Sequence, residues 1–201
     1  MKTNPSKQKV IDAASALFYQ KGFHGTSVRD ISEKATVNVS LISYYFKNKQ
    51  GLLEHAVTNY YEVYLTTIEK ILRDSEDMSS LDQLKMLIEA IIQYKQMNHQ
   101  FSCFIHRELS LDSIFVREMT VTYLAKENYY ISNIFFSVLS QNKKSDIDRQ
   151  FLLMQLKGML ITPYVLQNEW KNHLLGEQSH NLFIKKYVKT INNWLDYMVN
   201  T

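Results

Sequence analysis

The chain has 201 residues, of which 45% are hydrophobic and 21% charged, so it can bury a core without a disulfide or a metal. Its one cysteine, Cys103, excludes an intramolecular disulfide framework and favours a reducing compartment, so we expect a cytoplasmic protein. A polar start that leads into a helical pattern predicts no secretory signal, and no apolar run approaches the roughly 18 residues of a membrane span. Five Gly and two Pro argue against a many-turned fold. These features exclude the secreted, membrane and all-β classes.

The net charge of +3 is unevenly distributed along the chain. Residues 1–55 carry eight Lys or Arg against four Asp or Glu, a net +4, and the remainder has a net charge of −1. A small basic module before a larger neutral body predicts an anion-binding head. A merely solvated basic surface explains the charge alone equally well.

Hydrophobic spacing and capping signals predict three short helices in the head. Apolar residues three and four apart indicate a first helix from Asn4-Pro5 to Lys21, where Gly22 suits a left-handed cap. Ser27 followed by Asp30 is a weak form of the capping box for a second helix that runs to Ala35. Asn38 can cap a third helix, Val39 to Tyr45, and a long fourth helix starts near Gln50 and runs toward Leu72. The tight link at Thr36-Val37 makes the second and third helices a helix-turn-helix.

The third helix of such an arrangement can enter the DNA major groove. We expect Val39, Ser40, Ser43 and Tyr44 on its exposed face, and Ile42, Tyr45 and Phe46 turned toward the core. Hydroxyl and apolar groups suit hydrogen bonds to bases and contact with thymine methyl groups, whereas lysines, threonine and serine suit phosphates. A chance helical hairpin with a tyrosine-rich core remains the alternative. The predicted DNA-contacting residues are Thr26, Ser27, Asn38, Val39, Ser40, Leu41, Ser43, Tyr44, Lys47 and Lys49.

The segment from Phe18 to Val57 resembles the DNA-binding head of TetR-family regulators. The family pattern of a Phe-x-x-x-Gly-Phe turn, a hydroxyl-started second helix and an exit of the form Tyr-Phe-x-x-Lys-x-x-Leu is met by Phe18, Gly22, Phe23, Thr26, Tyr45, Phe46, Lys49 and Leu52. Many members carry a Tyr two places before the Tyr-Phe pair, where this chain has Ser43, and Tyr44 follows. Whether Ser43 or Tyr44 touches a base therefore stays open.

The rest of the chain predicts an all-helical body without strands or internal repeats. Helical runs are expected over residues 81–98, 101–111, 113–140, 146–173 and 177–200, and Pro163 should kink the fourth of these runs. Together with the resemblance, this predicts an all-α protein in which a long helix joins an N-terminal helix-turn-helix head to a helical bundle. We expect a DNA-binding domain over residues 4–64, with the helix-turn-helix at about 27–46, and a regulatory and dimerisation domain over 65–201.

The last two long helices are the usual dimerisation surface in families of this type. The final helix is apolar over more than one face, so a partner subunit could cover it, and burial within the monomer is the alternative. Paired heads would read two half-sites of a palindromic or pseudo-palindromic site, about one or more DNA turns of roughly 34 Å apart. The expected dimerisation residues are Leu182, Tyr187, Ile191, Trp194, Leu195 and Met198.

Part of the body resembles the RefZ-type forespore-capture DNA-binding proteins, a branch of the TetR family in spore-forming bacteria. The resemblance lies in residues 101–113, in Arg117-Glu118 and in residues 122–127. It implies binding near the replication origin, action on the tubulin-like division protein FtsZ during sporulation, and a nucleoid-associated location. Grouped charges could steer such a contact, although internal salt bridges explain them equally well. The candidate partner-binding residues are Arg107, Glu108, Asp112, Arg117 and Glu118.

No other chemistry is indicated by the sequence. The six histidines form no zinc-spaced cluster, although His99 and His106 share a face if one helix holds both, and hydrolase, dinucleotide and nucleotide-triphosphate motifs are missing. We therefore predict no enzyme, no metal, no cofactor and no membrane partner, and we expect Cys103 to be a buried thiol rather than a redox sensor. Thirteen Tyr and eight Met favour plain core, but they could line a pocket for a small apolar effector, which leaves an effector-released repressor as the alternative function.

Overall fold

The structure is a computed structural model that describes residues 5–108, 118–140, 144–166 and 177–200. Every regular element in these ranges is helical, and none of the residues described there forms a strand, which confirms the all-α class. The elements are α1 (Pro5–Lys21), α2 (Val28–Ala35), α3 (Val39–Phe46), α4 (Lys49–Asp74), α5 (Ser80–Met97), α6 (His99–Glu108), a π-helical turn η1 (Thr120–Leu124), α8 (Ala125–Val138), α9 (Asp146–Val165) and α11 (Glu177–Asn200). In the described part of the chain, no helix is long and apolar enough to cross a membrane.

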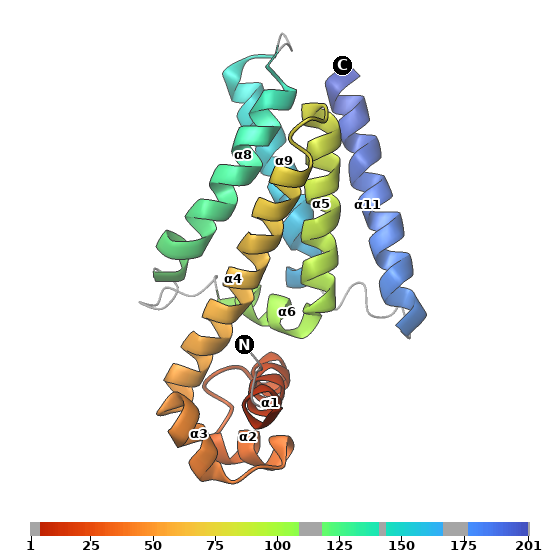
Figure 1. The fold of residues 1–201 in the computed structure, drawn as a ribbon. Coiled ribbons are helices and arrows are strands. Elements are labelled where there is room, and N and C mark those ends of the chain that lie inside the picture. The colour runs from red at the N-terminus through yellow and green to blue at the C-terminus, as the bar shows by residue number, and fades with distance from the viewer. Residues whose placement is uncertain (1–4, 109–117, 141–143, 167–176, 201) are drawn as a thin grey trace.

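Helices α1, α2 and α3 form a small head at one end of the molecule (Figure 1). Their inward-facing side chains are fully buried around Phe18 of α1, Ile31 of α2 and Ile42 of α3, and Leu52 at the start of α4 closes this core. Each of these residues belongs to a row of apolar residues at helical spacing, so each helix contributes one apolar face to the core of the head. The head therefore presents its outer faces, α3 included, away from the rest of the chain.

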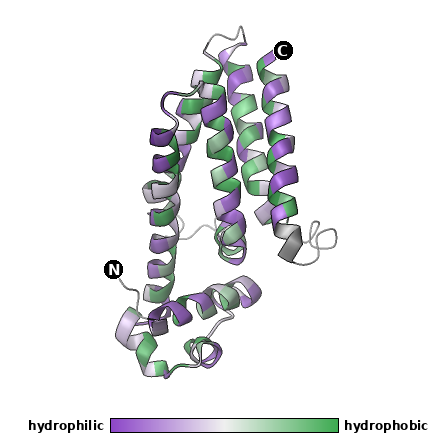
Figure 2. Cartoon of the chain, turned by 45° about the vertical axis from the view of Figure 1, so that its right-hand side comes forward, coloured by the Kyte–Doolittle hydropathy of each residue, from purple (hydrophilic) through white to green (hydrophobic). Residues whose placement is uncertain are grey.

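The body consists of α5, α6, α8, α9 and α11, and α4 runs from the head into it (Figure 1). Helices α5, α8, α9 and α11 lie along one another, whereas the short α6 crosses the end of the body that faces α1. Hydrophobic and hydrophilic residues alternate along every long helix, as expected for a bundle whose helices bury one face each (Figure 2). Helix α4 is shared by both parts and is the covalent strut between them.

The body helices differ from the prediction at their ends. The run predicted over 113–140 contains the π-helical turn η1 before α8 begins at Ala125, and the helix predicted to reach residue 173 ends at Val165, with residues 167–176 outside the described ranges. Pro163 lies inside α9 as predicted, where it cannot donate to the carbonyl of Met159. The phenol of Tyr187 on α11 donates to this carbonyl instead, at 2.7 Å, so the break in the α9 ladder is repaired by the neighbouring helix.

Candidate DNA-binding interface

Helix α3 projects its predicted face into solvent. Tyr44 is 79% exposed and Val39 49%, and Ser40 and Ser43 are exposed beside them. Ile42 and Phe46 are buried on the opposite face, and Tyr45 and Leu41 are half-buried between the two. A helix with hydroxyl, aromatic and apolar groups on one free face has the shape and chemistry of a helix that reads base edges.

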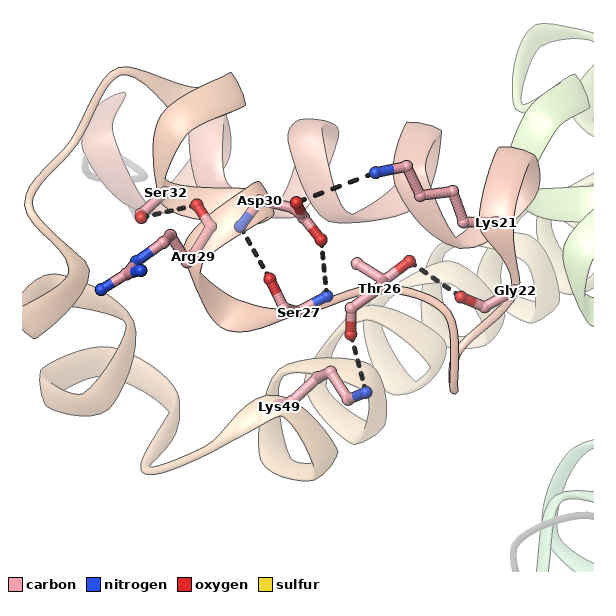
Figure 3. Close-up of polar contacts among 8 residues, drawn as sticks. All are labelled: Lys21, Gly22, Thr26, Ser27, Arg29, Asp30, Ser32 and Lys49. Atoms are coloured by element: carbon pink, nitrogen blue, oxygen red, sulfur yellow. Dashed lines mark hydrogen bonds and ion pairs between the residues drawn. The ribbon is translucent and has the colours of Figure 1, made fainter.

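Side-chain caps hold the helix-turn-helix in shape. The Oδ1 atom of Asn38 accepts from the backbone N–H and the hydroxyl of Ser40, at 2.9 and 2.8 Å, so the predicted cap of α3 is confirmed. At the start of α2, Ser27 and Asp30 form a complete capping box, with the two N–H···O bonds at 2.9 and 3.0 Å (Figure 3). The backbone N–H and hydroxyl of Ser27, and then Lys21, lower the pKa of the Asp30 carboxyl.

The turn between α2 and α3 is a Schellman motif. The N–H of Val37 donates to the carbonyl of Ser32 at 3.0 Å, and the N–H of Thr36 donates to that of Glu33 at 3.1 Å. Thr36 closes the motif with φ 55° and ψ 50°, in the left-handed region that favours glycine. A β-branched residue is strained there, so the geometry of this turn is held by the packing of the two helices around it.

Two of the side chains predicted to contact phosphates, those of Thr26 and Lys49, have their polar groups bonded within the head. Thr26 is 1% exposed, and its hydroxyl donates to the carbonyl of Gly22 at 2.8 Å (Figure 3). The ammonium of Lys49 donates to the carbonyls of Phe23 and Thr26, both at 2.8 Å, and lies 4.4 Å from the centre of the Phe23 ring. Lys49 therefore ties the start of α4 to the α1–α2 turn rather than extending toward DNA.

Two other cations are better placed at the surface. Lys47 is exposed at the exit of α3, where φ 67° and ψ −53° and a 2.8 Å bond from the N–H of Asn48 to the carbonyl of Phe46 define a strained γ-turn. Arg29 was missed by the sequence analysis. Its side chain is exposed on the first turn of α2 and extends away from the Ser27–Asp30 cap (Figure 3). Its position two residues after a capping serine was the signal that could have identified it.

Among the residues predicted to bind a partner, Arg107 differs most from the prediction. Its guanidinium donates to the carbonyls of Phe18 and Tyr19 in the last turn of α1, at 2.7 and 3.2 Å, so it joins the body to the head. Glu108 is half-buried with its carboxylate 4.0 Å from Arg107. Glu118 is exposed, and it lines a cavity of about 160 Å³ together with Glu54 of α4. Two further candidates, Asp112 and Arg117, lie outside the described residues.

On α11, several of the predicted dimerisation residues face the interior of the same chain. Ile191, Leu195 and Met198 are buried, and α11 packs against α5, so the alternative of burial within the monomer holds for these three. Leu182 is 44% exposed. Trp194 is half-buried, as is Tyr187, which makes the bond to α9 described above.

An exposed apolar stripe that the sequence analysis missed runs along α9. Its members recur at alternating steps of four and three residues, which is the seam spacing of a coiled coil. The opposite face of α9 is also apolar and is buried in the body, which is why the sequence pattern of this helix did not separate the two faces. We call this stripe the α9 seam; it consists of Ile147, Phe151, Met154, Gly158, Ile161 and Val165, of which all but Gly158 are exposed large hydrophobic residues.

The centre of the body contains a buried ion pair. Lys95 of α5, only 3% exposed, lies 3.3 Å from the carboxylate of Glu127 on α8, and the phenol of Tyr64 on α4 donates to the same carboxylate oxygen. Burial and the Glu127 charge both raise the pKa of Tyr64. Burial, and then the charge of Lys95, lower the pKa of His106 to about 3, so this imidazole is neutral at physiological pH.

Helix α6 holds both histidines that could share a face, but the structure does not bring them together as ligands. The rings of His99 and His106 each lie 6.0 Å from the ring of Tyr164 on α9. Cys103 lies between the two histidines in the sequence. Its side chain is buried, and its Sγ atom is 3.6 Å from Nε2 of His99. Within the described ranges, no group of three or more His, Cys, Asp or Glu side chains could hold a metal ion.

Comparison with known proteins agrees with the architecture. The model of the tetR family of bacterial regulatory proteins matches residues 10–56. The chain is 39% identical over 197 residues to the "Probable HTH-type transcriptional regulator YttP" of Bacillus subtilis, which covers 98% of this chain and 95% of that protein. It is 33% identical over 78 residues, 39% of this chain and 40% of that protein, to the biofilm operon regulator IcaR of Staphylococcus epidermidis.

Two solved structures share the fold. The TetR-family regulator PfmR of Thermus thermophilus superposes with a TM-score of 0.72 at 17% identity, over 92% of this chain and 96% of that one. The regulator FadR of Bacillus subtilis, in complex with stearoyl-CoA, superposes with a TM-score of 0.65 at 18% identity, over 90% and 95%. The capped helix-turn-helix, the helical body and the near full-length relative together show that this chain belongs to the TetR family of DNA-binding transcriptional regulators.

Proposed function

We propose that the chain is a sequence-specific regulator that binds DNA as a homodimer and reads bases with the exposed face of α3. The observation that carries this proposal is the outward placement of Ser40, Ser43 and Tyr44 on a helix whose other face is buried in the head. In this assignment Val39, Ser40, Ser43 and Tyr44 contact base edges, and Leu41 supports them from the rim of the face. The DNA-binding domain is assigned to residues 4–64, with the helix-turn-helix at about 27–46, and the regulatory domain to 65–201.

Phosphate contacts are assigned to groups that surround α3 and are exposed. Lys47 and Arg29 supply positive charge, and the side chains of Ser27 and Asn38 lie at the starts of α2 and α3, where backbone N–H groups favour anions. These contacts would position the head on the duplex without reading its sequence. Thr26 and Lys49 are not included, since their polar groups are bonded within the head.

Tyr44→Ala tests the assignment of α3. We expect specific DNA affinity to fall by about tenfold or more while non-specific affinity changes little, since a base contact is worth about 1–3 kcal/mol. Fluorescence anisotropy with a duplex selected from a random-sequence pool, and with a scrambled duplex, measures both affinities. Tyr129→Ala, which removes an exposed tyrosine of α8, is the matched control. Equal losses for both duplexes would contradict a base-reading role.

The homodimer is assigned to the α9 seam together with Leu182 and Trp194 of α11. The seam repeats every 3.5 residues on average over nearly the whole of α9, so a second copy could cover it by antiparallel or crossed packing of the same helix. Gly158 in the middle of the seam has nothing within 4 Å of where its Cβ would be, so the backbone of a partner helix could approach closely there. The two heads of such a dimer would be related by a two-fold axis, which is the symmetry of a palindromic or pseudo-palindromic DNA site.

Within the family we favour a RefZ-like role, in which the protein binds motifs near the replication origin and acts on FtsZ during sporulation. The support is the resemblance of residues 101–113, Arg117-Glu118 and residues 122–127 to that branch. The exposed Glu118 and Glu54 of α4 also line the same cavity, which brings two carboxylates to one place. Arg107 is withdrawn from the partner surface because it bonds to α1. The same proposal places the protein in the cytoplasm at the nucleoid and gives it no enzymatic activity.

An effector-responsive repressor is the second candidate, favoured by one observation. A cavity of about 130 Å³ between α6, α8 and α9 has apolar walls with polar groups among them; it is lined by His106, Leu124, Glu127, Asn128, Ile131, Lys157, Leu160 and Ile161. Ligand pockets are commonly about 300–1,000 Å³, so a bulky apolar ligand would have to push the helices apart. The stearoyl-CoA complex of FadR concerns that protein, and it makes acyl chains a reasonable first class to test.

Sequencing of DNA that co-precipitates with the crosslinked protein separates the two candidates. A few origin-proximal sites favour the division role, and a single promoter favours the repressor. In solution, the division regulator should keep its DNA and change the sedimentation of FtsZ polymers. The repressor should lose DNA affinity with an apolar ligand, through a coupling of about 1–3 kcal/mol. An unchanged FtsZ pellet together with ligand-dependent release would reverse our preference.

A further inference from the structure

Among the residues that the structure describes, the head is attached to the body at two places. One is α4, which is continuous from the head into the body, and the other is the contact between the end of α1 and the crossing helix α6 (Figure 1). A single helix is a strut about which the head could tilt. A second contact away from the axis of that strut fixes the direction in which the head points.

The second attachment has an apolar part. The rings of Phe18 on α1 and Phe104 on α6 are stacked with their centres 5.4 Å apart, and both are fully buried. The ring of Phe101 extends this cluster into the body; it is tilted against the ring of Phe104, with the two centres 5.7 Å apart. Stacked rings resist separation, but they slide over one another more easily than a directional bond allows, so they do not fix the tilt alone.

The directional part is Arg107. One of its terminal nitrogens donates to the carbonyl of Phe18 at 2.7 Å and the other to that of Tyr19 at 3.2 Å. The carbonyl of Phe18 also accepts the backbone N–H of Gly22 at 2.9 Å, so Arg107 adds a second donor at the end of α1, where the helix dipole favours a cation. Gly22 ends α1 with φ +74°, and an added Cβ there would lie 4.0 Å from the guanidinium. The planar guanidinium donates to two successive carbonyls with a fixed geometry, whereas the ammonium of a lysine is a point charge without a fixed plane of donors.

We propose that Arg107 is a positioning residue that fixes the separation of the two α3 helices in the dimer and so selects the spacing between half-sites. The proposal rests on the dimeric DNA-binding function proposed above. The dimer is formed by the body, so any tilt of a head against its body changes the distance between the paired α3 helices. One extra base pair moves a half-site by about 3.4 Å and rotates it by about a tenth of a turn, which a fixed head cannot follow.

The experiment compares spacings rather than single affinities. Wild-type dimer first selects a motif from a pool of random duplexes, and duplexes are then made with the selected spacer and with one base pair added or removed. Anisotropy gives the dissociation constant of each for wild type, Arg107→Ala and Arg107→Lys. Lys126→Ala is the control, because Lys126 pairs with Glu69 on the body and its loss removes the same charge.

We expect the ratio of dissociation constants between altered and selected spacers to fall by about tenfold in Arg107→Ala, the change expected from losing a charge-assisted hydrogen bond. Arg107→Lys should lie between Arg107→Ala and wild type, and Lys126→Ala should match wild type. The sequence preference within a single half-site should not change. Thermal unfolding and sedimentation confirm that each variant is a folded dimer, and Arg107→Lys carries the test if Arg107→Ala unfolds.

A ratio that stays at the wild-type value in a folded Arg107 variant overturns the positioning role. So does an equal loss of affinity for all spacers, which would indicate a merely structural or electrostatic effect. If wild type enriches no motif at all, the proposed DNA-binding function fails first, and that result is distinct from an unchanged spacing ratio.

Discussion

Thr36 is one of two non-glycine residues with positive φ in the described part of the chain, and both lie in the DNA-binding head. It takes φ 55° and ψ 50° at the C-terminal end of α2, where a β-branched side chain is crowded against its own backbone. The Schellman bonds at Ser32 and Glu33 need this conformation, because it redirects the chain into α3. The angle of the helix-turn-helix is thus maintained at a cost in stability.

Replacing Thr36 by Gly should therefore stabilise the protein. Glycine reaches the left-handed region without strain, so we expect the free energy of unfolding to rise by about 1 kcal/mol, measured by urea denaturation. Thr66→Gly, at an exposed position in the middle of α4, should lower it instead. A decrease for Thr36→Gly would mean that the side chain of Thr36 makes a contribution that its strain does not outweigh.

Lys47 and Lys49 carry the same charge two residues apart but have different surroundings. Lys47→Ala should lower DNA affinity and reduce the slope of log affinity against log salt by about 0.9, the value for one lost phosphate contact. Lys49→Ala should leave that slope nearly unchanged and lower the free energy of unfolding by about 2 kcal/mol, since two charge-assisted bonds within the head are lost. Anisotropy at several salt concentrations and urea denaturation measure the two effects. Identical salt slopes in the two variants would refute the distinction.

At this scale, the sequence predicted what local contacts decide. The Asn38 cap and the Ser27–Asp30 capping box join residues two or three apart, and both are confirmed. The bonds that changed the assignments of Lys49 and Arg107 join residues 23 to 89 apart. No pattern along the chain reports such partners, because they depend on how α4 and α6 pack against the end of α1.

At the scale of elements, α9 and α11 depend on each other through Tyr187. Pro163 leaves the carbonyl of Met159 without its helical donor, and the phenol of Tyr187 supplies the missing bond. Burial raises the pKa of Tyr187 to about 12, so the phenol stays protonated and able to donate throughout the physiological range. The proline was visible in the sequence as a kink, whereas its repair from another helix was not.

Tyr187→Phe removes only this bond. The Met159 carbonyl would be left unpaired, and we expect the free energy of unfolding to fall by about 1–2 kcal/mol in a denaturant titration. Tyr129→Phe on α8, where the tyrosine is 62% exposed, should change it by less than about 0.5 kcal/mol. Similar small changes in both variants would show that water replaces the phenol without loss.

Helix α9 also shows why an element can be predicted while its role is missed. Its start at Asp146 was predicted correctly and its end was not, and apolar residues on two faces concealed which face is free. Only the packing of α9 against α6 and α8 separates the buried stripe from the α9 seam. On α11, the packing likewise shows that Ile191, Leu195 and Met198, which were predicted to lie at a dimer surface, are buried in the core.

At the scale of the whole molecule, the α9 seam should decide the oligomeric state. Met154→Lys places two like charges close together in a dimer that uses this seam, and we expect sedimentation at micromolar concentration to change from dimer to monomer. Val121→Lys, at a 76% exposed position outside the seam, should remain dimeric. A dimer that survives Met154→Lys would require another interface.

The half-buried His106 should make the whole fold sensitive to acid. Its pKa is about 3 when folded, against 6.5 for an ordinary histidine, so the unfolded chain binds more protons between these values. Stability should therefore fall as pH drops from about 6.5 toward 3, by up to about 1.4 kcal/mol per pH unit. His106→Gln should flatten this part of the curve of unfolding free energy against pH, and His24→Gln, in the exposed turn after α1, should not. An unchanged slope in His106→Gln would locate the acid sensitivity elsewhere.

The Lys95–Glu127 pair constrains how this body can be inherited. Losing one member strands the other charge in the interior at a cost of about 3–5 kcal/mol, a large share of the stability of an ordinary domain. A lineage that loses the charge at one of these two positions should therefore soon lose the charge at the other or restore the first. Among homologous sequences, the positions of Lys95 and Glu127 should thus carry either two opposite charges or two neutral residues, and one charged residue opposite a neutral one should be rare.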